Sequence, residues 1–178
     1  MELNEKIKEY ILSKSVLRSE RRIGIEVECF IYTKNFSRIP VNRSKEYSAI
    51  DLLNELNRTN NDVNGTYSLE PGGQLEWSSP PCANMFELDD ALASYKNLMD
   101  NILSKRNLIS LHIGVEPFTD PDSIELIDQK KYQLMNMNME KRGSLGKWMM
   151  RNTSSIQVNY DIIDQRDLEE VMFIADCI

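Results

Sequence analysis

Three segments of this chain alternate apolar and polar residues with a period of two, as a β-strand with one buried face does. They span 23–31, 74–78 and 154–162. The polar side of each segment carries carboxylates or amides: Glu26 and Glu28, then Gln74 and Glu76, then Gln157 and Asn159. Lysine and arginine are missing from all three of these polar sides. The pattern predicts a sheet with one apolar face and one face lined by oxygen-bearing side chains.

Helical spacing of apolar residues separates these strands. Helices are predicted at 3–17, 48–57, 86–106, 130–139, 145–150 and 167–178, and two further strands at 67–70 and 108–115. Strands and helices do not follow a regular βαβ order. We therefore expect an α+β fold with a largely antiparallel sheet and helices packed on its outer face. No linker divides residues 1–178, which predicts a single folding unit.

Composition and charge exclude several classes of protein. Hydrophobic residues make up 41% of the 178 residues, but no run approaches the roughly 18–20 apolar residues of a membrane-spanning helix. The net charge of −7 argues against a nucleic-acid partner, because such binding depends on basic surfaces. A single histidine, His112, rules out a site built from several histidine ligands.

The three cysteines are widely spaced and fit neither a disulfide framework nor a zinc site. Cys29, Cys82 and Cys177 are expected to be reduced thiols. The first 19 residues hold several charges and no apolar signal core. These features predict a cytoplasmic location.

The oxygen-bearing strand faces have two interpretations from spacing alone. They are either solvated faces or a cradle for a hard divalent cation, which prefers oxygen ligands. Pro71-Gly72-Gly73 interrupts a strand between Glu70 and Glu76, and adjacent glycines allow a ligand to approach the backbone. A plain turn or bulge explains the same glycines. The basic loop 141–146 is a further, weaker candidate for holding a phosphate or a carboxylate.

Three blocks of sequence resemble the glutamate–cysteine ligase family, in its plant and proteobacterial branch. They are RIGIEVECF at 22–30, SLEPGGQLE at 68–76, and the 131–161 block, in which GSLG precedes an Arg-x-Thr and the strand QVNYD. The resemblance implies a cradle similar to that of glutamine synthetase, an antiparallel sheet facing ATP and Mg²⁺ or Mn²⁺. It implies ATP-dependent joining of the L-glutamate γ-carboxyl to the L-cysteine amine through a γ-glutamyl phosphate, the first step of glutathione biosynthesis.

The same resemblance assigns roles to individual positions. The implied metal ligands are Glu26, Glu28, Glu70, Glu76 and Gln157. Arg151 is implied to contact a substrate carboxylate or phosphate and to act in catalysis. The other implied substrate-binding residues are Gly72, Gly73, Gln74, Lys131, Tyr132 and Asn159.

Members of the family continue well beyond the third block. The resemblance therefore implies that residues 1–178 are the N-terminal part of one catalytic domain, incomplete and inactive alone. Two alternatives stay open. One is another carboxylate–amine ligase with a different amine acceptor, and the other is a non-catalytic protein that binds a metal or an amino acid. A structural domain without any ligand would leave the three oxygen-rich strand faces unexplained.

Overall fold

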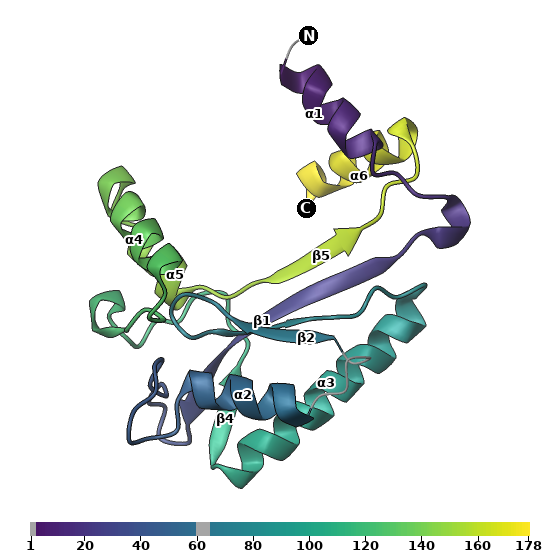
Figure 1. Cartoon of the computed structure of the whole chain (residues 1–178). Helices are drawn as coiled ribbons and strands as arrows, with labels where there is room; N and C mark the ends of the chain where they lie inside the picture. Colours follow the sequence, from purple (N-terminus) through teal and green to yellow (C-terminus); the bar gives the residue numbers. More distant parts are fainter. Residues whose placement is uncertain (1–2, 60–64) are drawn as a thin grey trace.

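The computed structural model describes residues 3–59 and 65–178, which form an open antiparallel sheet with helices around it (Figure 1). The strands are β1 (Ile23–Thr33), β2 (Thr66–Leu69), β3 (Leu75–Ser78), β4 (Leu108–Leu111) and β5 (Ile156–Tyr160). Their order is β2-β3-β1-β4, and β5 also pairs with β1. Every pairing is antiparallel, which confirms the expected mixed α and β structure with an antiparallel sheet.

The register places the predicted polar residues on one face of the sheet. Glu26 pairs with Ser78 of β3 and with Gln157 of β5, so these two strands flank β1 on opposite edges. Glu28 pairs with Glu76 of β3. Because residues directly opposite each other point to the same side, carboxylates from different strands share that side.

The other face of the sheet carries the hydrophobic core. Helices α2 (Ala49–Thr59) and α3 (Met85–Lys105) cover this face (Figure 1). Trp77 of β3 is fully buried, and its ring stacks on that of Tyr95 of α3 at a centroid distance of 4.6 Å. Burial of such aromatic rings supplies much of the energy that fixes helices on a sheet.

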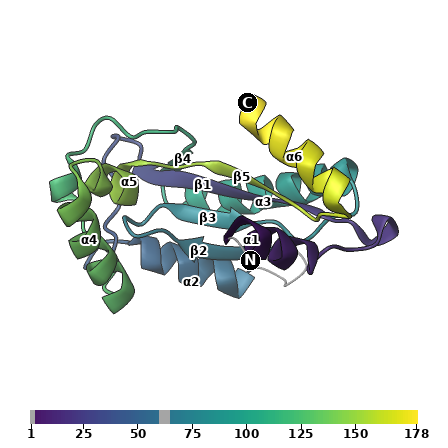
Figure 2. The ribbon, with the colours of Figure 1, turned by 90° about the horizontal axis from the view of Figure 1, so that it is seen from above.

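The remaining helices lie at the two ends of β1. Helices α4 (Lys130–Arg142) and α5 (Gly146–Asn152) lie at one end, and α1 (Leu3–Leu12) and α6 (Gln165–Cys177) at the other (Figure 2). Two short 3₁₀ turns, η1 (Arg18–Glu20) and η3 (Pro121–Ser123), connect them to the sheet. Among residues 3–59 and 65–178, no helix has both the length and the apolar character needed to cross a bilayer. The three cysteines are free, as predicted.

Two expectations, about the first helix and about β5, need correction. The first helix ends at Leu12 and not at residue 17. Directly after Leu12, the Ser13 hydroxyl donates to the Tyr10 carbonyl at 2.7 Å. Serine side chains compete for backbone groups in this way and terminate helices.

The alternation in β5 predicted a buried apolar side, but that side is exposed, with Val158 at 56%. The reason is that β5 packs mainly on β1, and neither α2 nor α3 extends beneath it.

The long helix α3 begins with a side-chain cap, which gives a simple test of the local structure. The Asn84 side chain accepts hydrogen bonds from the backbone N–H groups of Phe86 and Glu87. Replacing Asn84 by alanine is expected to lower the free energy of unfolding by about 1 kcal/mol, because these groups lose their partner. Urea denaturation measures this. Asn101→Ala, at an exposed position of the same helix, is the control and should not destabilise the protein.

Candidate functional site

Three glutamates from separate segments converge on the polar face of the sheet. Glu28 comes from β1, Glu70 from the turn after β2, and Glu76 from β3. One carboxylate oxygen of each lies within 4.8 Å of those of the other two, and all three residues are half-buried. Within the described part of the chain, this is the one such group of acidic, histidine or cysteine ligands. We refer to it as the carboxylate cluster.

The turn between β2 and β3 determines where Glu70 lies. The Gly73 N–H donates to the Glu70 carbonyl at 2.8 Å, and the Glu70 N–H donates to the Gln74 carbonyl at 2.9 Å. Gly73 has a φ of +80°, which a residue with a side chain adopts only at a cost. A Cβ on Gly72 would lie 2.6 Å from the α-carbon of Arg151. The two glycines are therefore needed for a tight turn that packs directly against α5.

Two serines fix the other carboxylates of the cluster. The Ser68 hydroxyl donates to Glu76 at 2.6 Å. Ser155 donates to Glu28 through its backbone N–H at 2.9 Å and through its hydroxyl at 3.1 Å. Strand alternation places Ser155 on the oxygen-bearing side of the third strand, whereas Ser68 was not among the predicted site residues. The strand register would have indicated Ser68, because it pairs directly with Glu76.

The electrostatics of the cluster favour a bound cation. The pKa of Glu70 is raised, first by burial and then by the neighbouring charges of Glu76 and Glu28. The positive charge of Lys131 opposes this rise only in part. A divalent cation among the three oxygens would remove the repulsion, and carboxylates are the ligands that Mg²⁺ and Mn²⁺ prefer. The residues present thus fit the metal that the resemblance implies.

The remaining predicted metal ligands lie farther along the same face. Glu26 accepts a hydrogen bond from the Asn159 side chain at 3.0 Å and is not part of the carboxylate cluster. Gln157 pairs with Glu26 across the β1–β5 ladder and is exposed. The structure therefore brings together three of the five predicted metal ligands and places Glu26 and Gln157 beside each other next to them.

Lys131 and Tyr132 lie beside the carboxylate cluster, and their contact with substrate stays a prediction. The Tyr132 hydroxyl donates to the carbonyl of Leu69 at 3.1 Å, one residue before Glu70. The Lys131 ammonium lies 4.3 Å from the centre of the Tyr132 ring. Helix α4 thus supplies a positive charge at the edge of a strongly negative site.

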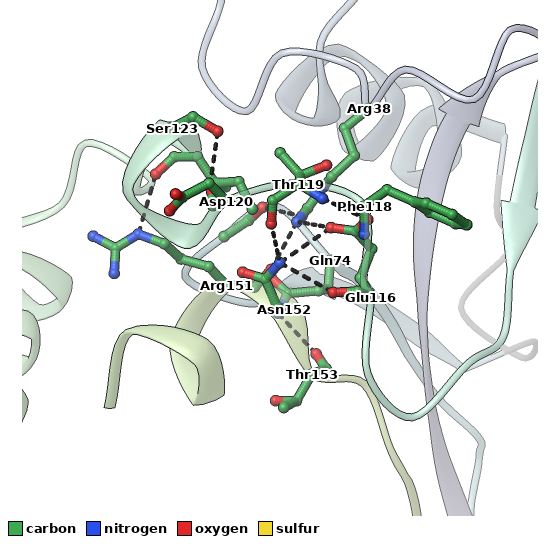
Figure 3. A network of polar contacts seen from close by, with 12 residues as sticks. Arg38, Gln74, Glu116, Phe118, Thr119, Asp120, Ser123, Arg151, Asn152 and Thr153 are labelled. Carbon is green, nitrogen blue, oxygen red and sulfur yellow. Dashed lines mark hydrogen bonds and ion pairs between the residues drawn. The ribbon is translucent and has the colours of Figure 1, made fainter. Parts of the chain in front are cut away.

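Gln74 and Arg151 are both buried and already have partners within the protein (Figure 3). The Gln74 amide donates to the carbonyl of Thr153 at 2.9 Å, and its Oε1 has no partner. Arg151 Nε donates to the carbonyl of Ile124 at 3.1 Å, and Nη1 donates to Asn136 at 3.0 Å. In this structure both side chains hold α5 against its neighbours, and their contact with substrate stays a prediction.

The loop at the GSLG motif borders an open pocket of about 840 Å³ between η3 and α4–α5. Gly143 and Ser144 line the pocket, whereas Lys141 and Arg142 do not. Its one lysine, Lys147, forms an ion pair with Asp122, and Glu140 lies 3.9 Å from the same ammonium. The charged residues of the lining are three acids and this one paired lysine, so the geometry gives no support to the predicted binding of a phosphate or carboxylate by this loop.

Comparison with known proteins points in one direction. The sequence model of glutamate-cysteine ligase family 2 matches residues 22–174. Glutamate–cysteine ligase B, chloroplastic, from Oryza sativa subsp. japonica is 28% identical over 179 residues, covering 92% of this chain and 35% of that protein. The chloroplastic glutamate–cysteine ligase of Medicago truncatula is 32% identical over 101 residues, covering 57% of this chain and 20% of that protein. The chain thus spans about a third, or less, of the length of these relatives.

Proposed function

Since this chain belongs to the glutamate–cysteine ligase family 2, we propose that it is part of an ATP-dependent glutamate–cysteine ligase. The single observation that carries the proposal is the carboxylate cluster of Glu28, Glu70 and Glu76 on the SLEPGGQLE hairpin and the strand beside it. The family match indicates the reaction class, and the carboxylate cluster supplies side chains suited to the metal that this reaction requires.

The reaction transfers a phosphoryl group and then forms an amide bond. An oxygen of the L-glutamate γ-carboxylate attacks the γ-phosphorus of ATP, and ADP leaves. The amine of L-cysteine then attacks the carbonyl carbon of γ-glutamyl phosphate, loses a proton, and displaces phosphate. Mg²⁺ or Mn²⁺, when bound, supplies positive charge that offsets the negative charge of the phosphates.

The residues of this chain contribute binding and orientation. Glu28, Glu70 and Glu76 would hold the cation, with Ser68 and Ser155 fixing two of these carboxylates in position. The resemblance also implies that Gly72 and Gly73 bind substrate. Both glycines are buried, and a Cβ on them would meet Arg151 and Val41, so in this structure they shape the turn that carries Glu70. Lys131 adds a cation that can attract a carboxylate or phosphate. No general base is required of the protein for the phosphoryl transfer itself.

Further parts of the proposal concern the setting of the site. We propose that the sheet is one portion of a cradle like that of glutamine synthetase, and that the protein works in the cytoplasm as the first enzyme of glutathione synthesis. The polar face lined by carboxylates and amides from β1, β3 and β5 supports the first point, and the absence of disulfides among the three cysteines is consistent with the second.

The proposal is tested by measuring phosphate release from ATP with Mg²⁺, L-glutamate and L-cysteine, and by detecting γ-glutamylcysteine by mass spectrometry. The complete product of the gene and residues 1–178 are assayed side by side. We expect activity from the complete product and none from residues 1–178, because these relatives are about three times as long. A complete product that uses glutamate and ATP but prefers another amine would identify a different carboxylate–amine ligase. Absence of turnover with every amine would refute the enzymatic proposal.

A further inference from the structure

A buried arginine lies behind the turn that carries Glu70. Arg38 belongs to the segment that returns alongside β1, where the Ile39 N–H donates to the Ile31 carbonyl at 3.3 Å. Its side chain is only 10% exposed, and its guanidinium carbon lies 5.0 Å from the centre of the Phe30 ring. The returning segment therefore carries the guanidinium group into the interior.

The guanidinium group of Arg38 bridges two backbone segments. Nη2 donates to the carbonyl of Gly72 at 2.7 Å, and Nη1 donates to the carbonyl of Arg151 at 2.7 Å. Gly72 lies in the turn that begins at Glu70, whereas Arg151 lies in the last turn of α5. A planar group with several donors in fixed directions can hold two carbonyls at once.

A buried acid balances the charge of Arg38. Glu116 is fully buried, and its carboxylate lies 3.9 Å from Nη1 of Arg38. The same carboxylate accepts hydrogen bonds from the backbone N–H of Phe118 at 2.7 Å and from the Asn152 side chain at 3.1 Å (Figure 3). An ion pair buried in this way keeps its geometry, because either charge alone would be costly to bury.

The turn is held by a donor at each of its first three carbonyls. The Gly73 N–H donates a hydrogen bond to the Glu70 carbonyl, and the Ile127 N–H donates one to the Pro71 carbonyl at 2.9 Å. The Arg38 guanidinium donates to the third carbonyl, that of Gly72, and is the one charged donor among these three. Charge-assisted hydrogen bonds are shorter and stronger than neutral ones. Among these contacts, Arg38 is therefore the one that joins the turn most firmly to the rest of the fold.

We propose that Arg38 is a positioning residue for cation binding, because its guanidinium group fixes the turn that holds Glu70 against Glu28 and Glu76. This inference rests on the proposed function, since it takes the carboxylate cluster as the cation site. Arg38 does not itself touch the cation. It acts through the backbone of Gly72, as groups outside the ligands of a metal commonly do.

The test is a Mn²⁺ titration of the 178-residue chain, followed by the electron paramagnetic resonance signal of free Mn²⁺. Arg38→Lys keeps the charge opposite Glu116 but cannot bridge two carbonyls. We expect it to weaken Mn²⁺ binding by about 10-fold or more. Arg43→Lys is the matched control, because Arg43 lies nearby in sequence, is 70% exposed and lies 3.9 Å from the Asp51 carboxylate. It should leave the affinity unchanged.

A second variant covers the case in which Arg38→Lys does not fold. The double variant Arg38→Gln with Glu116→Gln removes both charges and leaves no unpaired charge in the interior. We expect the same loss of Mn²⁺ affinity in this variant, measured well below its melting temperature and with an unchanged far-ultraviolet circular dichroism spectrum. A role in stability alone would lower the melting temperature without changing the affinity of the folded protein.

The outcomes separate this inference from the proposed function. If the wild type binds Mn²⁺ and a folded Arg38 variant binds it equally well, this inference is wrong and the proposed cation site stands. If the wild type binds no Mn²⁺, this inference fails, and the assay of the complete product alone decides the proposed function. A loss of affinity in the Arg38 variants, with Arg43→Lys unchanged, supports both.

Discussion

Replacing Glu76 by glutamine is expected to lower the Mn²⁺ affinity of the chain by roughly 100-fold, because cation affinity in oxygen sites depends on the number of charged ligands. Glutamine has nearly the same shape, and its side-chain oxygen can still accept the hydrogen bond from Ser68. The same change removes one of three carboxylates that repel each other. The metal-free variant should therefore melt at a higher temperature than the metal-free wild type.

The opposite signs of these two effects make the experiment specific. Mn²⁺ should raise the melting temperature of the wild type and leave that of Glu76→Gln almost unchanged. Glu9→Gln, at an exposed position on α1, removes the same charge far from the site in sequence and should behave as the wild type does. Equal stabilisation of the wild type and Glu76→Gln by Mn²⁺ would show that the cation binds elsewhere.

Glu26 lies on the same face of the sheet, and its replacement should lower the Mn²⁺ affinity by a smaller amount. The family resemblance implies that Glu26 is a metal ligand, but the structure places it outside the carboxylate cluster, bonded to Asn159. Glu26→Gln is therefore expected to weaken Mn²⁺ binding less than Glu76→Gln does. The same titration measures both variants, and an equal or larger loss in Glu26→Gln would restore Glu26 to the set of direct ligands.

Much of the fold could be predicted because the relevant signals are local. Alternation between 23 and 31 identified β1, and helical spacing of apolar residues identified α2 and α3 within two residues at each end. The extra length predicted for the first helix arose because Ser13 and Ser15 were read as helical, whereas their hydroxyls bond to backbone carbonyls of the preceding turn. The exposure of the apolar side of β5 could not be predicted, because it depends on which strands the helices reach.

The site was predictable only in part, because some of its residues have a local sequence pattern and others meet only through the tertiary fold. Strand periodicity and the glycine turn made Glu28, Glu70 and Glu76 candidates for a cation site, with a solvated face as the alternative, and the family resemblance implied that they are ligands. Arg38 and Glu116 gave no signal, because they come from loops and meet through contacts between residues 78 positions apart in the chain. The bond from the Gln74 amide to the carbonyl of Thr153, the residue after α5, also depends on how the chain folds back and has no local signal, while the implied contact of Gln74 with substrate stays a prediction.

Gly72→Ala is expected to lower the free energy of unfolding by about 1–3 kcal/mol, the range for an added group in a fully packed site. A Cβ at this position would lie 2.6 Å from the Arg151 α-carbon, 2.9 Å from Gln74 Oε1 and 3.1 Å from the Arg151 carbonyl oxygen. Two of these three atoms belong to the backbone, so a side-chain rotation cannot relieve the clash. The turn and α5 must move apart, which also displaces Glu70. We therefore expect a lower Mn²⁺ affinity in addition to the loss of stability.

Urea denaturation measures the stability, and the Mn²⁺ titration measures the affinity of the folded fraction. Gly114→Ala is the matched control, because a Cβ on Gly114 would meet no atom of the described residues within 4 Å. Its stability should equal that of the wild type or exceed it by a few tenths of a kcal/mol, since alanine restricts the unfolded chain. If Gly72→Ala is as stable as Gly114→Ala, the close packing of the glycine turn against α5 is wrong. If it is unstable but binds Mn²⁺ normally once folded, the turn supports the fold without positioning Glu70.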